Sequence, residues 1–229
     1  MKILAFNASP RKNKGATDIL LNHFLEAATE TGATTTKHYI TDLNINSCMG
    51  CFNCWTKTPG TCIHRDDMDW IIPEFGASDI IILATPIYNG NITHYLQQMT
   101  ERLLPTALPY QVEDGETTSH PPRYQKKPPK IVLIATAGFP DHQAFNIAKA
   151  LFPQALHITL PAAQLISNPE TAKHIEDFTE AVQKAAKLLV KRENVTPDLV
   201  ERLNVQYSPE MRQMIREQAN TYFYANIEG

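Results

Sequence analysis

The stretch KILAFNASPRKNKGAT, residues 2–17, decides the fold. It begins with a short apolar run over 2–7 and continues into a polar, basic turn that ends near Gly15. Over 16–31, apolar residues then recur every three or four positions, as on the buried face of a helix. A strand, a polar turn and an amphipathic helix in succession are the start of a unit that builds a parallel sheet.

The same alternation continues along the chain without an internal repeat. Further strands are expected at 34–40, 79–84, 131–135 and 156–160, and helices at about 66–75, 95–103, 145–151 and 168–189. The run at 79–84 is apolar on both faces, which predicts a central strand, whereas the threonine-rich run at 34–40 predicts an edge strand. Pro73 is expected to end or kink its helix, and Asn168-Pro169 to cap the last of these helices. The pattern predicts an α/β fold with helices on both faces of a parallel sheet.

Length and composition narrow the class of protein. The chain has 229 residues, 43% hydrophobic and 20% charged, which fits one decorated globular domain. The net charge of −3 argues against a nucleic-acid-binding surface. No apolar run approaches the roughly 18 residues of a membrane span, and the N-terminus lacks the pattern of a secretory signal. We therefore expect a cytoplasmic protein with no membrane partner.

Two segments lie outside the predicted sheet and helices. Residues 105–129 hold six prolines and form either a functional excursion or a stiffened surface loop. Residues 194–229 carry two further helix starts and a second apolar stripe. We expect one domain over 1–193, with the insertion at 105–129, and a helical extension over 194–229 that packs on the domain or on a dimer partner.

The turn after the first strand is a candidate phosphate site, because ligands of open parallel sheets bind beyond the carboxyl ends of the strands. It lacks the glycine patterns of dinucleotide and triphosphate sites. Its hydroxyls, cations and helix-start amides are donors suited to one terminal phosphate. These donors come from Ser9, Arg11, Lys12, Lys14 and Thr17. The alternative is an ordinary polar turn.

Two more loops leave the same edge of the predicted sheet. Residues 85–92 offer an exposed backbone with Ile87 and Tyr88, and residues 136–140 include Gly138, which permits close backbone approach. A monophosphate cradle beside two such loops fits flavin mononucleotide (FMN), which has one phosphate and a planar ring with hydrogen-bonding groups along one edge.

These motifs resemble the NADPH-dependent FMN reductase family of flavodoxin-like proteins. The resemblance rests on Ser9-Pro10-Arg11-Lys12, on Gly15-Ala16-Thr17 and on Thr85-Pro86-Ile87-Tyr88. The stretch from Cys48 through Cys62 to Met68 resembles the branch that contains the iron–sulfur flavoproteins. The resemblance to the family covers roughly residues 1–190. It implies a flavodoxin-like three-layer sandwich with five parallel strands in the order 2-1-3-4-5, bound FMN, and a homodimer or homotetramer.

The resemblance also implies the residues that contact FMN. The phosphate would be held by Ser9, Arg11, Ala16 and Thr17, with Lys14 as a further cation of the turn. The ring would be lined by Pro86, Ile87, Tyr88, Asn89, Gly90, Ala137 and Gly138. The sequence departs from the family at Asn89, where an aromatic residue is frequent, at Ala137, where cysteine is frequent, and at Glu101-Arg102 in place of Asp-Arg.

All four cysteines fall within 15 residues, at Cys48, Cys51, Cys54 and Cys62. Three intervals of this kind suit a 4Fe–4S cluster, as in the compact runs of ferredoxins. Zinc more often takes two separated pairs. The remaining alternative is a set of free thiols at the rim of the flavin site.

We expect an FMN-dependent NAD(P)H oxidoreductase that passes electrons to a small acceptor such as a quinone, an azo compound or a nitro compound. NAD(P)H would bind transiently, and no catalytic side chain is assigned. One alternative is an electron carrier in which FMN and a 4Fe–4S cluster serve ferredoxin-like partners. Another is a scaffold that has lost its cofactor and acts through its C-terminal helices. No hydrolase motif is present.

Overall fold

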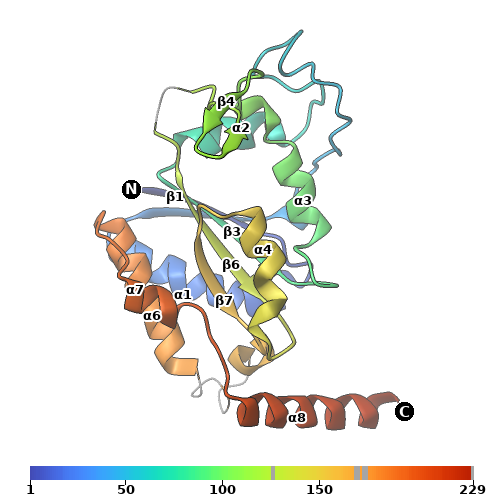
Figure 1. The fold of residues 1–229 in the computed structure, drawn as a ribbon, viewed down its shortest axis with the longest axis vertical. Helices are drawn as coiled ribbons and strands as arrows, with labels where there is room; N and C mark the ends of the chain where they lie inside the picture. Colours follow the sequence, from blue (N-terminus) through green and yellow to red (C-terminus); the bar gives the residue numbers. More distant parts are fainter. Residues whose placement is uncertain (125–126, 168–170, 172–174, 228–229) are drawn as a thin grey trace.

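The computed structural model describes residues 1–124, 127–167, 171 and 175–227. Its centre is a five-stranded parallel sheet in the order β2-β1-β3-β6-β7 (Figure 1). The strands are β1 (Lys2–Asn7), β2 (Thr34–Tyr39), β3 (Ile80–Pro86), β6 (Lys130–Thr136) and β7 (Leu156–Leu160). The predicted flavodoxin-like fold and strand order are confirmed.

Burial explains the position of each strand in the sheet. All seven residues of β3 are buried, because helices cover both of its faces and strands lie on both sides. In β2 no residue is fully buried, as expected for an edge strand with one strand neighbour. The predictions of a central strand near 80 and an edge strand near 34 are therefore correct.

Helices form a layer on each side of the sheet (Figure 1). On one face, α1 (Ala16–Glu30) and α6 (Glu176–Val190) pack together over Ile3, Ile80 and Ile82. On the other face lie α2 (Met68–Ala77), α3 (His94–Glu101) and α4 (Asn146–Leu151). Short 3₁₀ turns connect elements at η1 (Lys12–Lys14), η2 (Ile40–Asp42), η3 (Leu104–Thr106), η4 (His142–Phe145) and η5 (Ala163–Ser167).

Of the two expectations for Pro73, that it ends its helix or kinks it, the first is wrong. The helix α2 continues through Pro73 to Ala77, and its apolar face at Met68, Ile71 and Ile72 is buried. The packing of this face outweighs the missing backbone donor at Pro73. The expected cap at Asn168-Pro169 lies outside the described residues.

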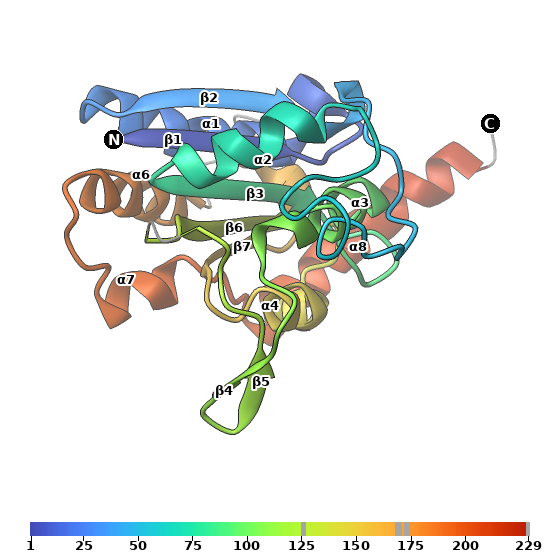
Figure 2. The same ribbon diagram turned by 90° about the horizontal axis from the view of Figure 1, so that it is seen from above.

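The proline-rich insertion contains a short hairpin, β4 (Val112–Asp114) with β5 (Thr117–Ser119). It projects from the body of the domain (Figure 2). At the base of the insertion, Arg123 donates hydrogen bonds to the carbonyls of Pro105 and Ala107, at 2.9 and 3.2 Å. The described part of the insertion is thus a structured excursion tied to its own first residues.

The C-terminal extension begins by covering the sheet edge at β7. Leu199 of α7 (Pro197–Arg202) and Leu203 are buried in the core of the α1–α6 face. Thr159 in β7 donates to the carbonyl of Leu203 at 2.9 Å, which satisfies an otherwise open strand edge. The last helix, α8 (Pro209–Ile227), buries only Ile215 and then runs outward from the body (Figure 1). None of the helices within the described residues is long and apolar enough to span a membrane.

Candidate functional site

The turn after β1 and the loops after β3 and β6 meet at one edge of the sheet, as predicted. The N–H of Ala8 donates to the carbonyl of Ala84 at 2.8 Å, and that of Ile87 donates to the carbonyl of Thr136 at 2.7 Å. The hydroxyls of Thr17 and Thr136 lie 2.7 Å apart, which joins the start of α1 to the end of β6. These bonds bring together the three segments that the sequence identified.

The β1–α1 turn, residues 8–17, is wound tightly around Ser9. The Ser9 hydroxyl accepts the N–H of Arg11 at 3.3 Å, and the Ser9 carbonyl accepts that of Lys12 at 3.0 Å. The hydrogen bonds of α1 begin only at Asp18, whose N–H donates to Gly15 at 3.0 Å. The earlier amides of the helix, at Ala16 and Thr17, therefore remain available at its positive end.

Gly15 keeps this turn free of its own side chains. A Cβ atom at position 15 would lie 2.9 Å from the Ser9 hydroxyl and 3.2 Å from the Cβ of Arg11. Any side chain at position 15 would therefore clash with the Ser9 hydroxyl, so the turn requires glycine there. A phosphate oxygen, which accepts hydrogen bonds from hydroxyls and amides, fits the chemistry of this turn.

The cations of the turn divide into two groups. Lys12 forms an ion pair with Asp42, so its positive charge is already balanced within the protein. Arg11 and Lys14 are the cations of the turn without an ion pair inside the described part of the chain, and Arg11 is exposed. The hydroxyl of Thr17 is bonded to Thr136 and almost fully buried, so the turn offers the backbone amide of this residue.

The loop after β3 turns back on itself at Asn89 and Gly90. Tyr88 and Asn91 exchange two backbone hydrogen bonds, at 2.9 and 3.1 Å, and the two residues between them have φ values of 50° and 76°. This is the type I′ turn that an Asn-Gly pair favours. It holds the Tyr88 side chain half exposed at the edge of the sheet.

The two predicted residues after β6 differ in what they expose. Ala137 is buried, its N–H donates to Leu160, and its carbonyl accepts the N–H of Ala163. Gly138 is exposed, and a Cβ there would find no atom within 4 Å. Of this pair, Gly138 therefore offers free backbone to a ligand. The neighbouring Phe139 is 74% exposed.

The cysteine segment, residues 43–67, follows the carboxyl end of β2 and so leaves the same edge of the sheet. Cys54 is buried, Cys48 and Cys62 are half-buried, Cys51 is exposed, and all four are free thiols. Burial raises the pKa of Cys54, and the nearby thiols of Cys62, Cys48 and Cys51 raise it further. Among the described residues, no three or more thiol, imidazole or carboxylate groups gather in an arrangement that could hold a metal ion. In this arrangement the thiols do not fit a cluster.

The cysteine segment packs on the proline-rich insertion. The indole of Trp55 donates to the carbonyl of Leu104 at 3.0 Å and lies 4.8 Å from the ring of His120. Arg123 also donates to the carbonyl of Cys54, at 3.4 Å. These contacts give the insertion a structural role in supporting the cysteine segment.

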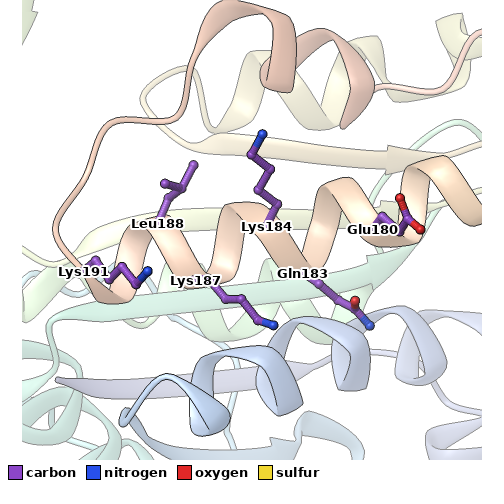
Figure 3. A pocket seen from close by; sticks show the side chains of 6 residues that line it. All are labelled: Glu180, Gln183, Lys184, Lys187, Leu188 and Lys191. Carbon is purple, nitrogen blue, oxygen red and sulfur yellow. The ribbon is translucent and has the colours of Figure 1, made fainter.

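Sequence reasoning missed a buried polar network beneath the β1–α1 turn, formed by Asn7, Asp18, Asn22 and Lys37. A signal was present in the sequence, because Asn7 and Asp18 are polar residues at positions where the strand and helix patterns predict burial. A surface hollow on α6 lies elsewhere and does not belong to this site. Figure 3 shows its lining residues, Glu180, Gln183, Lys184, Lys187, Leu188 and Lys191, along that one helix.

The strand order defines a flavodoxin-like protein, with a polar turn after β1 at the carboxyl edge of the sheet. The chain belongs to the NADPH-dependent FMN reductase family, whose model matches residues 1–174. The predicted family is confirmed.

The chain is also similar to proteins named iron–sulfur flavoproteins. An iron–sulfur flavoprotein of Methanocaldococcus jannaschii is 32% identical over 114 residues, 50% of this chain and 58% of that protein. One from Archaeoglobus fulgidus is 26% identical over 171 residues, 75% of this chain and 76% of that protein. The chain thus spans little more than half the length of the first of these relatives.

Solved structures share the fold at low identity. The NAD(P)H:quinone oxidoreductase of Methanothermobacter marburgensis is 14% identical with a TM-score of 0.62, over 86% of this chain and 99% of that one. An FMN-dependent NADH-azoreductase of Bacillus anthracis in complex with FMN is 16% identical with a TM-score of 0.60, over 83% and 100%.

Proposed function

We propose that this chain is an FMN-dependent NAD(P)H oxidoreductase that reduces a small-molecule acceptor. The observation that carries the proposal is the β1–α1 turn, a short segment that combines the Ser9 hydroxyl, the exposed cations Arg11 and Lys14 and the first amides of α1, and in which a Cβ at position 15 would lie 2.9 Å from the Ser9 hydroxyl. Hydroxyl, amide and guanidinium donors around one position suit a single phosphate group. When bound, FMN supplies the chemistry of hydride acceptance and electron transfer.

The residues of the chain would position FMN rather than take part in bond making. Ser9, Arg11, Lys14 and the amides of Ala16 and Thr17 would hold the phosphate. Pro86, Ile87, Tyr88, Asn89, Gly90, Ala137 and Gly138 would lie along the ring. Among these, the exposed backbone of Gly138 and the type I′ turn at Asn89-Gly90 can approach a planar ring closely.

The acceptor belongs to the class of flat, reducible small molecules. The structural neighbours named as quinone oxidoreductase and azoreductase support a quinone or an azo compound. NAD(P)H would bind transiently over the exposed face of the ring, since the β1–α1 turn has no dinucleotide-binding glycine pattern.

Binding and turnover measurements test the proposal. Purified protein should bind FMN, acquire flavin absorbance, and oxidise NAD(P)H in the presence of a quinone or azo dye. Arg11→Ala and Lys14→Ala should each weaken FMN binding by about 10- to 100-fold, because each removes a charge-assisted hydrogen bond to phosphate. Lys184→Ala on the exposed face of α6 removes one positive charge elsewhere and should leave binding unchanged. A wild-type protein that gains no flavin absorbance with added FMN would sink the proposal.

A second candidate is an electron carrier that uses the four cysteines together with FMN and serves ferredoxin-like partners. It is favoured by the relatives named iron–sulfur flavoproteins. A 4Fe–4S cluster would require the cysteine segment to rearrange. Anaerobic purification with iron and sulfide analysis separates the candidates: stoichiometric iron favours the carrier, and rapid NAD(P)H oxidation by iron-free protein favours the reductase.

We also propose that the chain is a homodimer or homotetramer. The outer part of α8 exposes large apolar side chains at Tyr222, Phe223, Tyr224 and Ile227. Exposed apolar surface of this kind is typical of contacts between subunits. Light scattering should give a mass of at least twice 25.8 kDa, and deletion of residues 219–229 should lower it to that of the monomer.

A further inference from the structure

A buried chain of hydrogen bonds joins the edge strand β2 to the β1–α1 turn. The ammonium of Lys37 donates to both carboxylate oxygens of Asp18, at 2.8 and 3.1 Å. The side-chain amide of Asn7 donates to Asp18 at 2.9 Å, and its carbonyl oxygen accepts the backbone N–H of Ser9 at 2.8 Å. The chain therefore ends on the residue around which the turn is wound.

The members of this chain are charged or polar groups that are buried at Asn7 and Asp18 and half-buried at Lys37. Asn7 is fully buried, and the side chains of Asp18 and Lys37 are 3% and 24% exposed. Burial lowers the pKa of Lys37, but its hydrogen bonds and its attraction to Asp18 and Tyr39 outweigh that effect and raise the pKa above its ordinary value. Lys37 thus stays charged and neutralises the carboxylate at neutral pH.

The side chain of Asn7 fits this place in one orientation. Its NH₂ group faces a carboxylate, which only accepts hydrogen bonds, and its oxygen faces the Ser9 N–H, which only donates. The carboxylate of Asp18 thereby sets the orientation of Asn7. Asn7 in turn sets the position of the Ser9 backbone.

The charge of Asp18 makes its neutralisation important for an anion. Asp18 follows Thr17 directly and lies in the first turn of α1, so its carboxylate shares the helix end that would attract a phosphate. Without a counter-charge, this carboxylate would repel the phosphate through a medium of low dielectric constant. Lys37 supplies that counter-charge from the neighbouring strand.

We propose that Lys37 and Asp18 are positioning residues for the phosphate of FMN: Lys37 cancels the charge of Asp18, and Asp18 orients Asn7 and through it Ser9. The inference rests on the proposed FMN site in the β1–α1 turn. It adds a specific consequence, that the network selects for the phosphate and has little effect on binding of the ring.

Comparison of FMN with riboflavin, which lacks the phosphate, tests this inference. In Lys37→Met the Asp18 carboxylate is left without its counter-charge, and the dissociation constant of FMN should rise about 10- to 100-fold. The constant for riboflavin should change less than about threefold, since riboflavin has no phosphate for the uncompensated carboxylate to repel. Lys37→Met with Asp18→Asn removes both charges and should restore most of the FMN affinity.

Two further variants keep the test decisive. Lys187→Met removes the ammonium that pairs with Glu30 at 3.5 Å on the exposed surface between α1 and α6, and should leave both ligands unaffected. Asp18→Asn alone keeps the hydrogen bond from Asn7 and the charge of Lys37, so FMN should bind at least as tightly as to the wild type. If Lys37→Met does not fold, weaker FMN binding by Asp18→Asn would still overturn the inference, and tighter FMN binding with unchanged riboflavin binding would support it.

The outcomes distinguish the two proposals. A wild type that binds FMN no better than riboflavin contradicts the phosphate site itself. A wild type that prefers FMN, together with Lys37→Met that keeps this preference or loses both ligands equally, overturns the role of the network alone. A double variant, Lys37→Met with Asp18→Asn, that binds FMN no better than Lys37→Met alone would likewise overturn it.

Discussion

Arg102 and Asp66 form a doubly hydrogen-bonded ion pair that closes the base of the cysteine segment. The guanidinium donates to the two carboxylate oxygens at 2.7 and 3.0 Å, and the two side chains are 1% and 0% exposed. The same guanidinium donates to the carbonyl of Asn46 at 2.6 Å, and the Asn46 N–H donates to Asp66 at 2.9 Å. One arginine, just beyond α3, therefore fixes both ends of the loop that carries the cysteines.

The first prediction concerns the stability that this pair provides. Arg102→Met leaves the Asp66 carboxylate buried without its cation, and should lower the free energy of unfolding by about 3–5 kcal/mol. Urea denaturation at pH 7 measures the change. Arg212→Met breaks a more exposed pair with Asp141, at 3.4 Å, and should cost less than about 1 kcal/mol. Equal losses in the two variants would contradict the importance given to burial.

The second prediction concerns acid. Burial by itself would raise the pKa of Asp66, but hydrogen bonds from Arg102, Asn46 and Met68 outweigh it and hold the pKa far below its ordinary value of 3.8. A carboxylate whose pKa is lower in the folded state stabilises the fold above its unfolded pKa, and this contribution is lost as the pH falls toward the folded pKa. Wild-type stability should therefore fall below about pH 4, by up to about 1.4 kcal/mol per pH unit from this group.

Denaturation curves between pH 2 and 7 check the acid prediction. Asp66→Asn should be less stable at pH 7, because Arg102 loses its counter-charge, yet should lose less stability on acidification than the wild type. Asp69→Asn alters an exposed carboxylate paired with Arg65 and should give an acid dependence parallel to that of the wild type. A wild-type slope reproduced in Asp66→Asn would show that other groups cause the acid loss.

The third prediction concerns Gly15. In Gly15→Ala the new Cβ would lie 2.9 Å from the Ser9 hydroxyl, so the turn must open or the hydroxyl must move. We expect FMN affinity to fall about tenfold or more, since a charge-assisted bond to the phosphate is lost. Riboflavin affinity should hold. Calorimetric titration with both ligands measures this.

Gly76→Ala is the matched control for Gly15→Ala. A Cβ at position 76 in α2 meets only Tyr124, at 4.0 Å, so the substitution should be neutral or stabilise the helix by up to about 1 kcal/mol. It should leave flavin binding unchanged. Unchanged FMN affinity in Gly15→Ala would mean that the phosphate does not enter the β1–α1 turn.

Local patterns sufficed to predict the sheet and the turn after β1. The fully apolar run at 80–83 predicted a central parallel strand, and β3 is buried along its whole length. The polar turn before Ala16 predicted a helix start, and α1 begins at Ala16. The order of strands came from a resemblance between motifs, because periodicity alone does not say which strands are neighbours.

Local sequence patterns did not predict ion pairs between residues that lie far apart in the sequence. Asp66 and its acidic neighbour predict a helix start, and α2 does begin at Met68, whose N–H donates to Asp66 at 3.1 Å. Nothing local indicates that Asp66 pairs with Arg102, which is 36 residues away. The bond between Lys37 and Asp18 likewise depends on the packing of β2 beside β1. Such pairs are set by the tertiary fold, so only coordinates reveal them.

The last prediction separates the ring side of the site from the phosphate side. Gly90 has φ of 76°, and a Cβ there would meet no atom within 4 Å, so Gly90→Ala introduces backbone strain of about 1–2 kcal/mol without a clash. The strain loosens the turn that holds Tyr88 at the edge of the sheet. FMN and riboflavin share the ring, so both affinities should fall by the same factor, about three- to tenfold. The control is Gly115→Ala, at φ of 63° in the turn of the β4–β5 hairpin, which carries the same strain and should leave both affinities unchanged. A fall confined to FMN in Gly90→Ala would place this loop against the phosphate, and would reverse the orientation of the flavin proposed for this site.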